Sequence, residues 1–130
     1  MAVPKTEAKR NPALLEMARG RPCLVRVPLL CRDERDTVVA AHSNQSIHGK
    51  AGARKADDQY IAWCCARCHH FIDQGKAPGR MRNGFWDTGH LKQINEWRRI
   101  AVDMSEPERF RKAALWALNE LNATPVGNDI

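Results

Sequence analysis

Apolar residues recur every three or four positions in the last third of the chain, and this spacing predicts two helices. The first apolar series comprises Leu91, Ile94, Trp97 and Ala101. The second begins after Ser105, whose spacing to Glu108 is typical of a helix-opening capping box, and it runs to Leu121. We expect both helices to pack over a sheet formed by the preceding part of the chain, and residues 122–130 to form a loose tail.

Polar and apolar positions are mixed on a shorter scale before that. Asn11 precedes a proline, which is typical of a helix start and predicts a helix over residues 12–19 that Gly20 ends. The polar, glycine-containing segments 43–55 and 75–89 predict loops.

The remaining apolar runs are short and rich in β-branched residues. They predict strands over residues 37–42 and 60–64. Residues 23–31 have the same character but contain Pro28, which leaves either a strand or an extended loop. Residues 65–73 are expected to turn sharply into a helix.

Length and charge narrow the class of protein. The 130 residues suffice for about one domain, and the low aromatic content of 6% predicts a modest core that a bound metal ion would reinforce. No apolar run approaches the ~18 residues of a membrane span, and the N-terminus lacks an apolar secretory segment, so we expect a cytoplasmic protein without a membrane partner. The net charge of +6 favours a polyanionic partner such as nucleic acid.

Five cysteines in such a chain favour metal binding over disulfides. The spacing of Cys65 and Cys68 allows both thiolates to reach one ion at ~2.3 Å, and Cys23 and Cys31 are the candidates for the two remaining tetrahedral positions. We expect Zn²⁺, because a site of four thiolates usually holds zinc or an iron–sulfur cluster and nothing in the sequence indicates electron transfer. Two alternatives stay open: Cys64 could replace Cys65, or the cysteines could be ordinary buried apolar residues.

A second candidate site overlaps the first. His69 and Asp73 are four residues apart on the expected helix, so both side chains project from one face and can bind one hard cation. His42, at the end of a predicted strand, is the third member, because an imidazole can accept a proton from water at neutral pH. The alternative interpretation is that His42 is an ordinary hydrogen-bonded residue.

Several segments together resemble the HNH nucleases, whose fold is the ββα-metal finger. In chain order they are the strand end Ala40-Ala41-His42, the Gly- and Lys-rich loop 48–58, and the sequence Cys65-Ala-Arg-Cys68-His69 that opens a helix. Within that superfamily the chain is most similar to the YbcO-like nucleases of phages and prophages, through the residues from Ala18 to Pro28 and from Cys65 to Asp73. The resemblance covers about residues 11–75.

The resemblance implies an α+β fold, with a small zinc-stabilised ββα-metal core (the HNH or His-Me finger) and additional C-terminal α-helices. Residues 1–130 would form a single domain, with the core at about 11–75 and the helical extension at about 90–123.

The resemblance also implies roles for individual residues. His42 falls on the general base, and His69 and Asp73 fall on the ligands of a catalytic Mg²⁺ or other divalent cation. Cys23, Cys31, Cys65 and Cys68 would form the structural zinc site. Many HNH enzymes carry an aspartate or histidine where this chain has Ala41, and the middle asparagine of the motif is missing. Asp58 lies near the position of that asparagine and is expected to order the loop, with Asn44 as a less favoured substitute.

The implied function is metal-dependent hydrolysis of nucleic-acid phosphodiester bonds, most simply of DNA, inside a bacterial host cell. The residues expected to contact phosphates are Lys50, Arg54, Lys55 and Arg67. The four tryptophans are expected to be core or helix-packing residues, and Trp86, in the expected loop, is the only one of them with an alternative role in touching substrate. One alternative is a zinc-stabilised nucleic-acid-binding module that cuts nothing. The other is a phage recombination or replication accessory protein whose C-terminal helices form a homodimer or partner surface.

Overall fold

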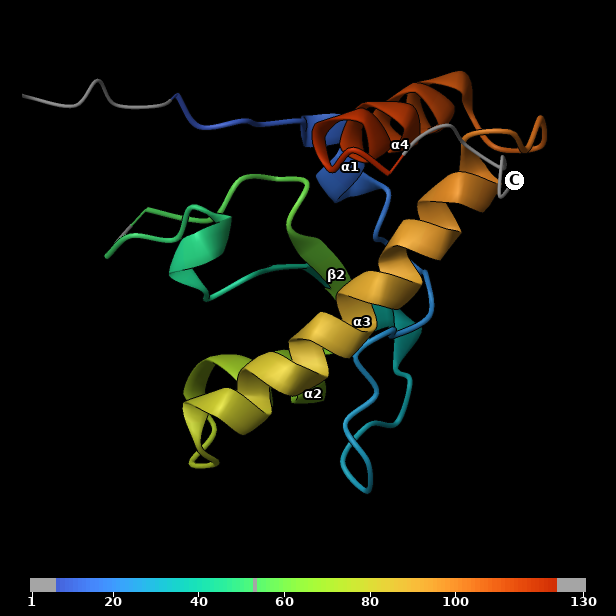
Figure 1. Ribbon diagram of the computed structural model, residues 1–130. Helices are drawn as coiled ribbons and strands as arrows, with labels where there is room; N and C mark the ends of the chain where they lie inside the picture. Colours follow the sequence, from blue (N-terminus) through green and yellow to red (C-terminus); the bar gives the residue numbers. More distant parts are fainter. Residues whose placement is uncertain (1–6, 53, 124–130) are drawn as a thin grey trace, which may run out of the picture.

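The computed structural model describes residues 7–52 and 54–123, in which one helix precedes two strands and three helices follow them (Figure 1). The elements are α1 (Pro12–Glu16), β1 (Val39–His42), β2 (Ile61–Cys64), α2 (Ala66–Gln74), α3 (Gly79–Ile100) and α4 (Glu108–Glu120). Two short 3-10 helices, η1 (Arg35–Thr37) and η2 (Ser46–His48), lie before and after β1. Most of the expected tail, residues 124–130, lies outside the described residues.

The two predicted strands are confirmed and form an antiparallel pair, with Val39 opposite Cys64 and His42 opposite Ile61. All four residues of β2 are buried. Cys65 then caps the N-terminus of α2, so the hairpin leads directly into a helix. The protein is therefore a small mixed α/β domain with a two-stranded sheet.

Helix α3 crosses the molecule and supplies much of its core against β2 (Figure 1). Its buried residues are Trp86, Gly89, His90, Gln93, Trp97 and Ile100. A Cβ atom at Gly89 would lie 2.9 Å from Cγ2 of Val25, closer than carbon atoms approach one another. Glycine at this position therefore lets α3 lie directly on the segment that follows Cys23.

The predicted loop over residues 75–89 is wrong, because α3 already begins at Gly79. Glycines in this segment weaken helix propensity, but packing outweighs that weakness. Trp86 is 3% exposed and its Nε1–H donates to the carbonyl of Ala41 at 2.9 Å. Trp86 is therefore a core residue that ties α3 to β1, as expected for the tryptophans, and its alternative role in touching substrate is wrong.

The capping box predicted at Ser105 is wrong as well. Helix α4 begins at Glu108 after Pro107, whereas the Ser105 hydroxyl donates to Oδ1 of Asp103 at 2.6 Å. The Ser105 side chain therefore binds within a turn with Asp103 and does not cap α4. The apolar face of α4 is confirmed, with Ala113, Ala114, Ala117 and Leu118 buried. This face packs on α1 and α3 more than on the sheet.

Two N-terminal expectations are also corrected. Helix α1 ends at Glu16, and residues 17–20 form a turn in place of the expected last helical turn. Residues 23–31 form the extended-loop alternative, with no strand, since Arg26 and Leu29 adopt left-handed backbone angles that interrupt a strand. None of the helices in the described residues has the length and apolar character needed to cross a membrane.

Candidate functional site

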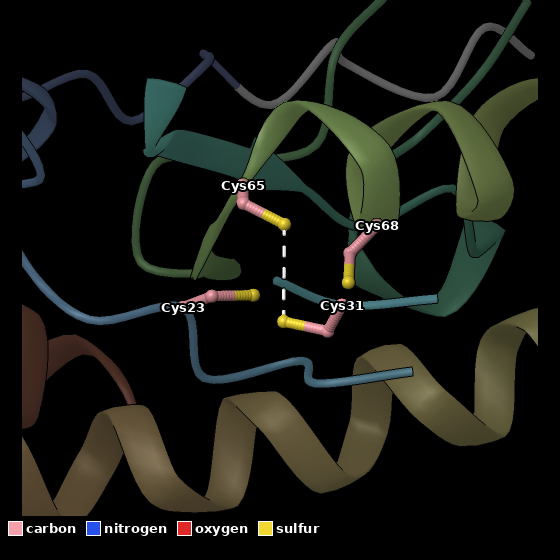
Figure 2. Close-up of side chains that lie close together, drawn as sticks. All are labelled: Cys23, Cys31, Cys65 and Cys68. Atoms are coloured by element: carbon pink, nitrogen blue, oxygen red, sulfur yellow. Dashed lines mark hydrogen bonds between the residues drawn. The ribbon is translucent and has the colours of Figure 1, made fainter. Parts of the chain in front are cut away.

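Four cysteine sulfurs meet between the loop 23–31 and the start of α2 (Figure 2). The Sγ atoms of Cys23, Cys31, Cys65 and Cys68 all lie within 4.8 Å of one another, and those of Cys31 and Cys65 are 3.9 Å apart. Thiolates at ~2.3 Å from a tetrahedral zinc ion lie ~3.8 Å from one another. The cluster has these dimensions and could hold a metal ion such as zinc.

Backbone N–H groups surround the sulfurs as they do in metal-thiolate sites. The N–H of Val27 donates to Sγ of Cys68, and the N–H of Asp33 donates to Sγ of Cys31, both at 3.4 Å. Arg26 and Asp33 have φ angles of 46° and 48°, so the chain turns sharply beside each sulfur. Such donors stabilise negative charge on thiolates and orient them for a metal ion.

Cys64 lies outside this group of four, on β2, with no exposed surface. Hydrogen bonds with Cys23 and Cys68, together with burial, raise the pKa of Cys64, so its thiol stays protonated. The geometry therefore favours Cys65, and not Cys64, as the partner of Cys68.

A cavity of about 670 Å³ lies beside α1, β1, the loop after β1 and α2. His42 from β1 and the pair His69 and Asp73 from α2 all line it. The structure thus brings together the three residues that the sequence grouped as one catalytic site.

His42 is held by a buried carboxylate. Its Nε2 lies 2.8 Å from Oδ1 of Asp58, whose side chain is 2% exposed. An ionised carboxylate can only accept hydrogen bonds, so the Nε2 atom of His42 carries the proton, and in the neutral ring Nδ1 carries the lone pair. Asp58 also accepts hydrogen bonds from the backbone N–H of Asn11 at 2.6 Å and from Arg10 at 3.2 Å. Asp58 therefore fixes the His42 ring to the N-terminal segment.

These contacts determine the ionisation of Asp58. Burial raises the pKa of Asp58, but the hydrogen bonds from His42, Asn11 and Arg10 and the charge of His42 outweigh it, so the pKa lies below its ordinary value. A lowered carboxyl pKa stabilises the fold above the unfolded-state pKa of ~3.9, and that stabilisation is lost as the pH falls through the folded-state pKa.

We expect Asp58→Asn to lower the free energy of unfolding by about 1–3 kcal/mol at pH 7, because the variant replaces a charged acceptor of three hydrogen bonds with a neutral amide. The difference between the two proteins should shrink below about pH 4, where the carboxyl of the unfolded chain becomes protonated, and should be lost as the pH falls through the lowered pKa of native Asp58. Urea unfolding from pH 3 to pH 7 measures this. A difference independent of pH would contradict the assignment of an ionised Asp58.

His69 and Asp73 form the second half of the site. Nε2 of His69 lies 2.9 Å from Oδ2 of Asp73, and the amide of Asn44 donates to Oδ1 of Asp73 at 2.8 Å. Burial raises the pKa of Asp73, but these hydrogen bonds and the nearby charges of His69 and Arg82 outweigh burial, so the pKa lies below its ordinary value. The 2.9 Å separation is that of a hydrogen bond and is also close to the ~3.0 Å between neighbouring ligands of an octahedral cation with ~2.1 Å bonds, so the His69–Asp73 pair could hold a divalent cation.

The predicted phosphate-contacting residues divide into two groups. Lys50 and Lys55 line the cavity. Arg54 instead pairs with Asp57 at 3.3 Å, and Arg67 pairs with Glu34 at 3.2 Å. The structure thus brings two of the four basic residues to the site.

Sequence reasoning missed the contacts that hold the site residues. Arg10 and the backbone of Asn11 bind Asp58 across more than 45 positions of sequence, and no local pattern indicates such a contact. Asn44 was the less favoured substitute for the missing asparagine, and its position two residues after His42 was the available signal. Ala41 is fully buried, so position 41 adds nothing to the cavity lining.

Comparisons with known proteins identify similar chains. The family model described as "Putative nuclease YbcO" matches residues 12–102. The curated proteins "Putative nuclease YbcO" of Escherichia coli K12 and "Putative nuclease ybcO" of Enterobacteria phage 82 are each 35% identical over 81 residues, covering 62% of this chain and 75% of theirs. A solved structure, described as that of "a putative bacteriophage protein" from Escherichia coli K-12, superposes with a TM-score of 0.54 at 27% identity, covering 67% of this chain and 98% of that one.

Proposed function

The chain belongs to the YbcO family, and on that premise we propose that it is a metal-dependent endonuclease of the HNH type that hydrolyses phosphodiester bonds in DNA. The observation that carries the proposal is the cavity in which His42 lies together with His69 and Asp73. The order of hairpin and helix around the four cysteines, β1, β2 and then α2, supports an assignment to the ββα-metal fold.

In the proposed mechanism His42 is the general base. Asp58 accepts the proton-bearing Nε2–H, so Nδ1 of His42 is free to take a proton from the attacking water. The Asp58 carboxylate then stabilises the imidazolium that forms. The buried hydrogen bonds of Asp58 keep the ring in this orientation before substrate arrives.

His69 and Asp73 would hold the catalytic cation, Mg²⁺ or another divalent ion, with Asn44 fixing the second oxygen of the carboxylate. A divalent cation at this position would supply charge neutralisation for the transition state and the leaving oxygen. Lys50 and Lys55 bind the flanking phosphates from the cavity wall. The four cysteines would hold a structural Zn²⁺, which would fix the start of α2 and with it His69.

A plasmid-nicking assay tests the proposal. Protein with its zinc retained should convert supercoiled DNA to nicked and linear forms in Mg²⁺, Mn²⁺ or Ni²⁺, and chelation of the weakly held divalent ion should stop cleavage without unfolding the protein, as circular dichroism would report. The absence of cleavage with every ion would favour the second candidate, a zinc-stabilised nucleic-acid-binding module. The buried Ala41, which offers no ligand atom, is the observation in favour of that candidate.

Asn44→Ala should weaken Mn²⁺ binding about tenfold or more, because the variant frees Oδ1 of Asp73 and lets the carboxylate rotate away from His69. Titration of Mn²⁺ followed by the paramagnetic resonance of the free ion measures the affinity. Gln45→Ala is the matched control, since this neighbouring amide binds Asp87 instead. Equal affinities in all three proteins would refute the positioning role of Asn44.

A further inference from the structure

The cavity of the proposed nuclease site has two chemically different ends. Val39 and His42 are the first and last residues of β1, about 10 Å apart at the rise of a β-strand. Around and beyond His42 the lining is polar: Asn44, Lys50, Lys55, His69 and Asp73. Around Val39 it is mostly apolar, with Leu15 from α1 and Val38, Val39 and Ala40 from β1 and the residue before it, and the charged residues Glu16 and Arg19 also line the cavity near α1. Pro12 lies toward His42, because its neighbour Asn11 and His42 both bind Asp58. Val39 keeps 44% of its surface exposed, so this apolar wall is open to a ligand.

The free edge of β1 adds hydrogen-bonding groups to the apolar end. The N–H of Ser43 donates to the carbonyl of Tyr60 at 2.9 Å, so the backbone of Ser43 faces the neighbouring strand. In an antiparallel pair every second residue faces its partner in this way, so Ala41 does the same opposite Ala62 on β2. Ala40 alternates with these positions, so its N–H and C=O point away from β2. Trp63, which lies opposite Ala40 on β2, likewise points its backbone groups away from β1: its carbonyl accepts from the N–H of Leu24, and its N–H donates to the side chain of Gln93.

We propose that this apolar end is a subsite for an unpaired nucleobase of the strand being cut, and that single-stranded or unpaired DNA is therefore the preferred substrate class. The proposal rests on the proposed nuclease function. A nucleobase needs an apolar surface for its ring and polar groups for its edge, and Leu15 with Val39 supplies the first while the backbone of Ala40 supplies the second.

Charge and continuity select this occupant. The apolar end opens into the same cavity as Lys50 and Lys55, so a ligand that fills both ends carries an apolar ring joined to an anion. A nucleotide has this composition, with its phosphate at the His69–Asp73 end. A base within a duplex is paired and stacked, and it would have to unstack before it could enter, which favours strands that are already unpaired.

Binding of a 2-aminopurine oligonucleotide tests the subsite. His42→Ala protein, without added divalent cation, is titrated with a single-stranded oligonucleotide and with the same oligonucleotide in a duplex. We expect about tenfold tighter binding of the single strand and a change in 2-aminopurine fluorescence. Leu15→Gln and Val39→Thr should weaken single-strand binding several-fold while leaving duplex binding unchanged. The ratio of single-strand affinity to duplex affinity should then fall toward one.

Exposed apolar residues outside the cavity provide matched controls. Leu115→Gln on α4 and Val102→Thr after α3 make the same chemical changes and should keep the native preference. Equal binding of both DNA forms, or equal losses for both in the cavity variants, would overturn the subsite. Failure of the nuclease proposal is distinguishable, because unmodified protein would then bind the single strand with the same preference and leave it uncut in every divalent cation.

Discussion

Replacing His42 with alanine is expected to reduce phosphodiester cleavage by roughly 10²–10⁴-fold while leaving nucleic-acid affinity within about twofold. The reason is the position of His42 at the cavity wall with Nε2 committed to Asp58, which leaves Nδ1 as the proton acceptor. Alanine removes the base but leaves Lys50 and Lys55 in place. Single-turnover cleavage and a separate binding titration measure the two quantities.

The control for His42→Ala is His70→Ala. His70 lies on α2 next to His69, but it is exposed and belongs to a different surface hollow with Leu30 and Phe71. This variant should cleave at the native rate. Full activity of a pure His42→Ala protein would remove His42 from the mechanism, and equal losses in the two variants would point to contamination or to a general loss of fold.

Substitution of Asp58 should have an effect on cleavage between those of His42→Ala and His70→Ala. Asp58→Asn keeps an acceptor for His42 but loses the negative charge, so we expect a smaller decrease in cleavage than His42→Ala causes. Since Arg10 and Asn11 bind the same carboxylate, the N-terminal segment and the proposed base share one hydrogen-bond network. Substitution of Arg10 should consequently affect catalysis as well as stability, although Arg10 contributes no general acid or base.

Residues close in sequence were the ones that sequence reasoning placed well. Cys65 and Cys68, or His69 and Asp73, are separated by a fixed number of residues on a turn or helix, so spacing alone predicts their geometry. Cys23 and Cys31 were predicted by elimination, because metal chemistry requires four ligands and the chain holds few thiols. The contact between Asp58 and His42 joins residues 16 positions apart across a loop, and no local pattern determines how that loop closes.

Helix α3 is an element that local sequence signals predicted wrongly. Its glycines made residues 75–89 resemble a loop, yet Gly89 is needed where α3 lies against Val25, and Trp86 is needed where α3 binds β1. A residue type that signals a turn locally can thus be required for close packing in a helix. Whether such a segment forms a turn or a helix depends on the part of the chain that it packs against. For Trp86 that partner is Ala41, which lies more than 40 positions away in the sequence.

The double variant Cys65→Ser, Cys68→Ser is expected to lose bound zinc and to unfold at ordinary temperature. Binding of a structural zinc ion contributes about 10–16 kcal/mol in small thiolate sites, which is comparable to or larger than the ~5–15 kcal/mol total stability of a domain. Two of the four sulfurs come from the start of α2 and two from the loop 23–31, which holds no regular strand, so a bound metal ion would join these two segments. Elemental analysis and thermal unfolding followed by circular dichroism measure both effects.

Cys64→Ala is the matched control, because it removes a buried thiol next to the cluster but no proposed ligand. This variant should retain one zinc ion per chain and lose only the stability of a small core truncation, about 1 kcal/mol. Loss of zinc from Cys64→Ala together with its retention in the double variant would reverse the assignment of Cys64 and Cys65. A folded double variant that melts at the native temperature would show that the four sulfurs contribute only ordinary packing, and His69 would then be held in place by the pairing of β1 with β2 and by α3 without any metal ion.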